Sequence, residues 1–143
     1  MNWLIKEEPG SYSFDQLTAD GGACWSGVRN PLAQRHLKAI RKGDRILYYH
    51  TGTVRAIVGL CRAKTSAFQD PADRTGRYAA VDIVPVRALP RPVTLAELKT
   101  NKRFASHPLV RISRLSVMPI SDAELREIER LAGSKARSRR AVK

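Results

Sequence analysis

The sequence predicts one α+β domain, in which short strands and short capped helices alternate along the chain. Its 143 residues, 43% of them hydrophobic, are enough for a single core. Only brief stretches marked by proline or glycine interrupt the pattern, and no internal repeat is visible. Nothing in the composition therefore predicts a second folded domain.

The first elements are a strand and a small helix. Residues 2–6 have the pattern of a short strand, and Pro9-Gly10 turns the chain after it. Ser13 is a favourable helix cap with Gln16 at the capping-box position, which predicts a helix directly after Ser13.

A second helix is predicted from Asn30 to about Arg41. Asn30 is a good cap and Pro31 suits the first helical position. Helical spacing places four apolar or aromatic side chains on one face: Leu32, His36, Leu37 and Ile40. Residues 45–50 follow as a strand that we expect to be buried on both sides.

Two longer strands are predicted over residues 55–65 and 78–89, separated by the polar loop 69–76. Gly59 indicates a bulge or a close approach of backbone in the first of them. We expect Pro90 and Pro92 to end the sheet. Strands of this kind are typical of a barrel.

Two further capped helices and one strand complete the pattern. Thr94 with Glu97 predicts a helix of two turns, residues 114–119 predict a strand, and Ser121 with Glu124 predicts the last helix. Gly133 is suited to end that helix.

The most informative stretch is Trp25-Ser26-Gly27-Val28-Arg29-Asn30-Pro31, a glycine-containing loop that enters a helix. Aromatic faces and guanidinium planes bind nucleobases, and free N–H groups at a helix N-terminus favour an anion or a base acceptor. Two simpler interpretations stay open: Trp25 packs in the core, or Arg29 and Asn30 are only a solvated arginine and a cap.

The charge balance points to a polyanionic partner. Lysine and arginine number 26 against 13 acidic residues, which gives a net charge of +13. Residues 134–143 carry five of these positive charges, and we expect them to form a disordered basic tail. Its Arg137, Arg139 and Arg140 are the expected phosphate contacts, while residues 1–133 form the folded domain.

Several other classes of protein are not indicated. No apolar run has the length of a membrane span, and the N-terminus does not resemble a signal peptide, so we expect a cytoplasmic protein. Cys24 and Cys61 lack metal-site spacing and are expected as buried free thiols. The histidines are scattered, so no metal site and no cofactor are predicted.

A set of motifs in the same order resembles the EVE domain family of the PUA-like superfamily, which is related to the YTH readers of methylated adenine. The motifs are Trp3-Leu4-Ile5-Lys6-Glu7-Glu8-Pro9, Tyr12-Ser13-Phe14-Asp15-Gln16-Leu17, Trp25-Ser26-Gly27-Val28-Arg29-Asn30, Gly43-Asp44, Tyr49-His50 and Arg114-Leu115-Ser116-Val117-Met118-Pro119. The resemblance spans residues 2–133 and implies a mixed β-barrel with short helices around its rim. Glu7 departs from the family, which often has serine or threonine there, and adds a charge close to the implied pocket.

The resemblance also implies a site. Trp25 would stack on a modified base, and Val28 with the backbone of Arg29 and Asn30 would line one edge. The other implied ligand contacts are Lys6, Glu8, Arg114 and Ser116. The plainer alternatives are that Lys6 is a surface lysine, Glu8 a strand-end charge and Ser116 a solvent-facing hydroxyl, and we expect Tyr12 and Tyr49 in the core or at the rim.

We therefore expect a non-catalytic module that binds a modified nucleobase, flipped out of DNA or RNA into a pocket walled by Trp25. A monomer without a membrane role is the expected state. The main alternative is a hydrolase of modified nucleosides, similar to the ASCH family, in which Lys6 and Glu8 activate the nucleophile and transfer protons. A protein-interaction domain without a base pocket is a third possibility.

Overall fold

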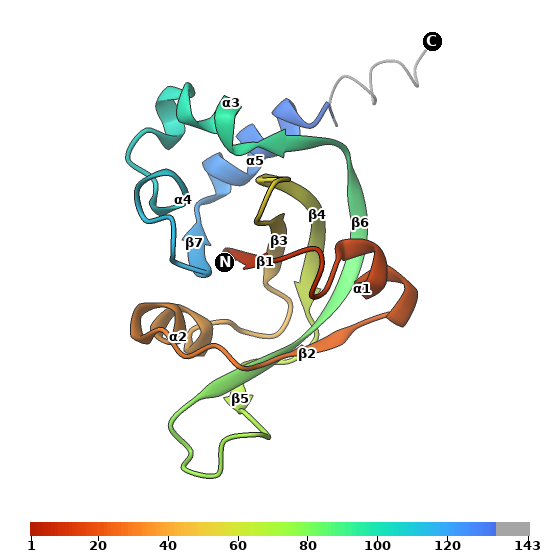
Figure 1. The fold of residues 1–143 in the computed structure, drawn as a ribbon, viewed down its shortest axis with the longest axis vertical. Coiled ribbons are helices and arrows are strands. Elements are labelled where there is room, and N and C mark those ends of the chain that lie inside the picture. The colour runs from red at the N-terminus through yellow and green to blue at the C-terminus, as the bar shows by residue number, and fades with distance from the viewer. Residues whose placement is uncertain (134–143) are drawn as a thin grey trace.

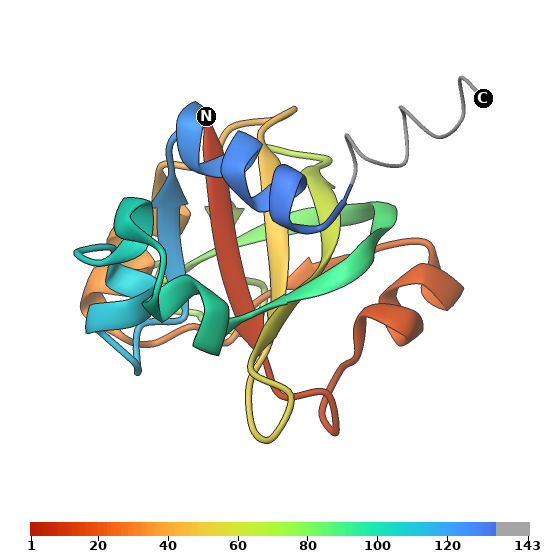
Figure 2. The ribbon, with the colours of Figure 1, turned by 90° about the horizontal axis from the view of Figure 1, so that it is seen from above.

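The computed structural model describes residues 1–133 and shows a strongly curled mixed sheet with short helices around it (Figures 1 and 2). The strands are β1 (Asn2–Glu7), β2 (Ala23–Trp25), β3 (Arg45–His50), β4 (Ala56–Ala63), β5 (Phe68–Gln69), β6 (Ala79–Thr94) and β7 (Val117–Ile120). The helices are α1 (Phe14–Asp20), α2 (Pro31–Lys38), α3 (Leu95–Lys99), the 3-10 helix η1 (Lys102–Phe104), α4 (Pro108–Arg111) and α5 (Asp122–Leu131). The expected tail 134–143, with Arg137, Arg139 and Arg140, lies outside the described residues.

The strand order in the sheet is β2-β6-β4-β3-β1-β7, with β5 paired to β6. β1 and β3 run parallel, whereas the other pairs are antiparallel. The long β6 sweeps around the molecule, so that β2 and β5 lie at one end of it and α3 at the other (Figure 1). This confirms the predicted α+β barrel-like architecture.

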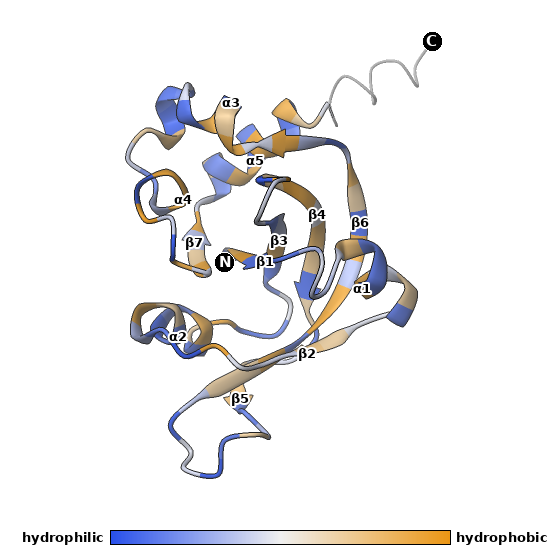
Figure 3. Cartoon of the chain, in the orientation of Figure 1, coloured by the Kyte–Doolittle hydropathy of each residue, from blue (hydrophilic) through white to orange (hydrophobic). Residues whose placement is uncertain are grey.

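The buried centre of the sheet is built from β1 and β3. Leu4, Ile5, Leu47 and Tyr48 are at most 1% exposed, as expected for strands covered on both faces. In Figure 3 β4, the strand beside β3, is largely orange, whereas the loop after β5 is mostly blue. Among residues 1–133, no helix has both the length and the apolar character to cross a membrane.

The predicted helix caps are present. Ser13 accepts a hydrogen bond from Gln16 N, and Asn30 accepts one from Ala33 N. Ser121 forms a full capping box with Glu124, as Thr94 does with Glu97 in a helix of only five residues.

The prediction that Pro90 and Pro92 end the sheet is wrong, because β6 continues to Thr94. The ladder between β4 and β6 shifts there: Gly59 pairs with Ala88, but Ile57 pairs with Val93. The prolines therefore fall in a bulge, where a missing N–H costs no ladder hydrogen bond.

Gly59 lies at the same irregularity and confirms the predicted close approach. A Cβ atom built there would be 2.4 Å from ring atoms of Phe14, so α1 packs directly onto the backbone of β4.

Four short elements were not predicted from the sequence: β2, β5, η1 and α4. They have two to four residues each, too few for a periodic signal.

Candidate functional site

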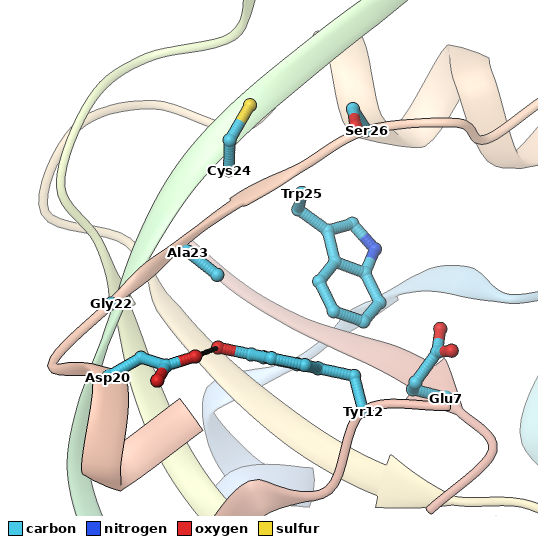
Figure 4. Close-up of a pocket in the computed structure, with 8 residues that line it drawn as sticks. All are labelled: Glu7, Tyr12, Asp20, Gly22, Ala23, Cys24, Trp25 and Ser26. Carbon is cyan, nitrogen blue, oxygen red and sulfur yellow. Dashed lines mark hydrogen bonds between the residues drawn. The ribbon is translucent and has the colours of Figure 1, made fainter. Parts of the chain in front are cut away.

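A cavity of about 410 Å³ lies between β2, the end of β1 and the segment leading into α1 (Figure 4). It is called the Trp25 cavity here. Its lining residues are Glu7, Tyr12, Asp20, Gly22, Ala23, Cys24, Trp25 and Ser26. Figure 4 shows the Trp25 indole directed toward Tyr12, with the Glu7 carboxylate beside it.

Trp25 belongs to both the core and the cavity. Its side chain is 8% exposed and meets the Tyr48 ring edge-on, at 5.6 Å between centroids. Both interpretations of the sequence therefore hold: Trp25 packs in the core, and it also forms a wall of the cavity. The packing fixes the ring in one orientation as a wall of the cavity.

Tyr12 forms the second aromatic wall, although its expected place was the core or the rim. Its hydroxyl donates to Asp20 Oδ2 at 2.6 Å, and its carbonyl accepts from the Tyr48 hydroxyl at 2.8 Å. Burial, followed by the hydrogen bond to Asp20, raises the pKa of Tyr12 to about 12. Tyr12 is thus held in place at both its backbone and its ring.

Glu7 enters the same cavity, although it was not among the ligand contacts expected from the sequence. Burial, followed by repulsion from Glu8, raises the pKa of its carboxyl. That carboxylate forms no hydrogen bond or ion pair with any residue between 1 and 133. The one signal in the sequence was its departure from the family pattern.

Lys6 points to the opposite face of β1, because neighbouring side chains of a strand alternate. Its Nζ donates to Ser113 O at 3.0 Å and lies 5.4 Å from the Tyr49 ring centre. Burial lowers its pKa. Lys6 is therefore neither a surface lysine nor part of the Trp25 cavity, and it lines a separate cavity of about 280 Å³ with Arg55 and Lys99.

Three other expected contacts also lie outside the lining of the Trp25 cavity. Glu8 is exposed and accepts a hydrogen bond from Gly10 N at 3.1 Å. Ser116 is half-buried, and its carbonyl accepts from Lys6 N at 3.0 Å. Arg114 is exposed.

The loop after Trp25 is fixed by polar side chains rather than by a regular ladder. Buried Asp70 accepts from Gly27 N at 2.9 Å and pairs with Arg29 at 3.4 Å. The backbone N–H groups of Gly27 and Ala72 lower the pKa of Asp70. Gln34 donates to Val28 O at 2.7 Å.

Arg29 is consequently turned away from the Trp25 cavity. Its guanidinium lies 4.2 Å from the centre of the Tyr78 ring and lines another surface groove. Val28 is half-buried against the core, and Asn30 is used as the cap of α2. Of the eight expected ligand contacts, only Trp25 lines the cavity that it was expected to form.

Cys24 also lines the Trp25 cavity, but it is exposed, so its expected burial is wrong. The strand β2 turns this side chain outward, next to the inward-facing Trp25. Cys61 is a buried free thiol, as predicted. Within residues 1–133, no group of histidine, cysteine and carboxylate side chains is arranged to hold a metal ion.

A curled mixed sheet with short rim helices and an aromatic cavity at one side defines a PUA-like domain. Within that class, the chain belongs to the EVE domain family, whose model matches residues 1–131. Membership confirms the resemblance carried by the motifs around Trp3, Trp25 and Arg114.

The similarity to solved structures and to curated relatives agrees with this family assignment. The structure of Rpa0253 from Rhodopseudomonas palustris is 41% identical, with a TM-score of 0.88 over 92% of both chains. Mouse thymocyte nuclear protein 1 is 30% identical over 85% of this chain and 69% of its own length. Human THYN1, solved in complex with DNA containing 5-methylcytosine, is 26% identical, with a TM-score of 0.83 over 92% of this chain and 96% of that one.

The ASCH family is a more distant neighbour. An ASCH protein from Zymomonas mobilis is 13% identical, with a TM-score of 0.52 over 88% of this chain and 94% of that one. This similarity shows a shared fold alone.

Proposed function

We propose that this protein is a non-catalytic module that binds a modified nucleobase, flipped out of a nucleic acid strand into the Trp25 cavity. The observation that supports the proposal most directly is the pair of aromatic walls, Trp25 and Tyr12, around a cavity of about 410 Å³. The human relative with the same fold is solved with DNA that contains 5-methylcytosine.

The physical chemistry of the cavity suits a base. Its volume falls in the usual range of small-molecule sites, about 300–1,000 Å³. Stacking on an aromatic side chain contributes about 1–3 kcal/mol per base, which offsets the few kcal/mol that flipping a base costs. Packing against Tyr48 and the Asp20 hydrogen bond hold the two rings before the ligand arrives.

The hydrolase alternative has less support. It would use Lys6 and Glu8 as an acid–base pair beside the bound base. Lys6 lies on the opposite face of β1, and Glu8 is not part of the Trp25 cavity lining. These residues therefore do not supply proton transfer to a base held against Trp25.

Titration of matched oligonucleotides with Trp25→Ala tests the proposal. The parent protein should prefer an oligonucleotide carrying one modified base over its unmodified counterpart, in DNA or in RNA. Trp25→Ala should remove about 1–3 kcal/mol of stacking, a loss of about ten- to hundredfold in affinity for the modified strand.

Thermal unfolding of Trp25→Ala separates lost binding from lost stability. This control is needed because truncating a buried tryptophan lowers the free energy of unfolding by about 3–5 kcal/mol. Tyr12→Ala provides a second variant from the less buried wall of the cavity. A folded Tyr12→Ala or Trp25→Ala protein with unchanged selectivity would show that the cavity does not bind the base.

A further inference from the structure

A groove of about 420 Å³ is lined by residues of the segment after β2, of α2 and of the segment before β6. It is called the Arg29 groove, and its lining residues are Arg29, Pro31, Gln34, Arg35, Lys38, Arg77 and Tyr78. Four of the seven are cations and none is acidic. The groove thus differs in character from the Trp25 cavity, whose lining includes the carboxylates Glu7 and Asp20.

Three of the four cations are available to a ligand. Arg35, Lys38 and Arg77 are exposed, and none of them forms an ion pair within the part of the chain that the structure describes. Arg35 and Lys38 are three residues apart on α2, so they project from the same side of that helix. The helix contains no acidic residue that would neutralise them.

The nearby acidic side chains are engaged elsewhere. Asp70 is fully buried and accepts from Gly27 N and Ala72 N. Asp73 accepts from the Thr75 hydroxyl at 2.6 Å and from Tyr78 N at 2.7 Å. Of the carboxylates between residues 1 and 133, only Asp70 pairs with a groove cation, Arg29, so the groove keeps an excess of positive charge.

The groove is also held in a defined shape. Arg29 lies on the Tyr78 ring at 4.2 Å and is tied to Asp70, while Arg77 lies 6.0 Å from the same ring centre. Gln34 bonds to both Val28 O and Ala79 N, which joins α2 to the start of β6. Arg29 and the backbone frame of the groove are therefore in place before an anion binds, so ordering them adds little to the entropy cost of binding.

The groove and the Trp25 cavity are separated by one short segment. Trp25 and Ser26 line the cavity, whereas Arg29 and Pro31 line the groove. Four residues of chain span at most about 14 Å. A strand that carries a phosphate every ~3.4 Å along a duplex axis can cover that distance within a few nucleotides.

We propose that the Arg29 groove binds the phosphodiester backbone of the strand whose modified base enters the Trp25 cavity. The inference rests on the proposed base-binding function and adds the path of the flanking strand. The groove contributes affinity that does not depend on base sequence, because its cations contact phosphate, and the cavity contributes the selectivity.

The test is the double variant Arg35→Gln/Lys38→Gln. Removal of two phosphate contacts should weaken binding to modified and unmodified oligonucleotides alike. It should also reduce the slope of log affinity against log salt by about 1.4–1.8. Binding of the free modified nucleoside, which has no phosphate, should stay at the level of the parent protein.

Arg103→Gln/Arg126→Gln is the matched control. It removes the same charge from exposed residues of η1 and α5. These elements lie at the end of the molecule away from α2 and β5 (Figure 1). Equal salt slopes for the two double variants would overturn the proposal, and so would loss of nucleoside binding in the groove variant. The parent protein could bind modified and unmodified strands equally well while the groove variant still shows the smaller salt slope. In that case only the base-binding function would be wrong.

Discussion

At the scale of single residues, the Trp25 cavity takes its chemical character from Glu7, Tyr12 and Trp25. The sequence identified Trp25 because an aromatic residue before a helix start is a recognisable pattern. It did not identify Tyr12 as a wall, because that role depends on the Asp20 hydrogen bond and on the fold of the segment before α1. The role of Glu7 depends on which face of β1 it occupies.

Glu7 should favour a base with an amino group at the edge it contacts. A carboxylate with no partner among residues 1–133 can accept a hydrogen bond from the cytosine N4 amino group, whereas a carbonyl oxygen there would repel it. 5-Methylcytosine and thymine make a matched pair, since both carry the methyl group and differ at this edge. We expect the parent protein to prefer 5-methylcytosine and Glu7→Ser to reduce that preference about tenfold, the lower part of the 1–3 kcal/mol range for a specific base contact.

The comparison requires competition binding with oligonucleotides that differ at this one base. Glu8→Ser is the control, because Glu8 carries the same charge but lies outside the cavity lining. An unchanged ratio in Glu7→Ser, or an equal change in both variants, would contradict the assignment.

At the scale of elements, local signals identified the helices well and the sheet less well. Caps such as Ser13, Asn30 and Ser121 act over three residues, so the sequence contains the whole interaction. β2 and β5 exist only through their pairing with β6, which is distant in the chain. The path of β6 past Pro90 depends on a bulge against β4 and not on its own sequence.

Gly59→Ala should destabilise the contact between β4 and α1. The added methyl group would lie 2.4 Å from the Phe14 ring, and Phe14 is itself buried. Overpacking of this kind costs about 1–3 kcal/mol. Chemical denaturation should show that loss, whereas Gly10→Ala, whose Cβ would have no neighbour closer than 3.6 Å, should remain close to the parent protein. Equal stability of the two variants would mean that Phe14 moves aside at little cost.

At the scale of the whole molecule, the positive charge is divided between residues 1–133 and residues 134–143. The net charge of +13 predicted a polyanionic partner, but the sequence could not show where on the surface the charge gathers. That location depends on α2 and the start of β6, which bring Arg35 and Arg77 to one groove. The motif order was enough to predict the family and the fold.

Deletion of residues 134–143 should weaken binding to all oligonucleotides by a similar factor. The segment contains five lysine and arginine residues, which attract any phosphate backbone without reading bases. Titrations at several salt concentrations should show a shallower salt dependence for the truncated protein. A change in the ratio between modified and unmodified strands would instead assign part of the selectivity to this segment.

The alternation along β1 has a consequence for how this domain tolerates mutation. One peptide bond separates Lys6, which lines a cationic cavity, from Glu7, which lines an aromatic one. Loss of a single residue earlier in the strand would put the Glu7 carboxylate in the place of Lys6, where it would face Arg55 and Lys99. Gain of a single residue would put the Lys6 ammonium group in the place of Glu7, in the aromatic cavity. Substitutions can therefore tune either cavity separately, but insertions and deletions in this strand would disable both at once.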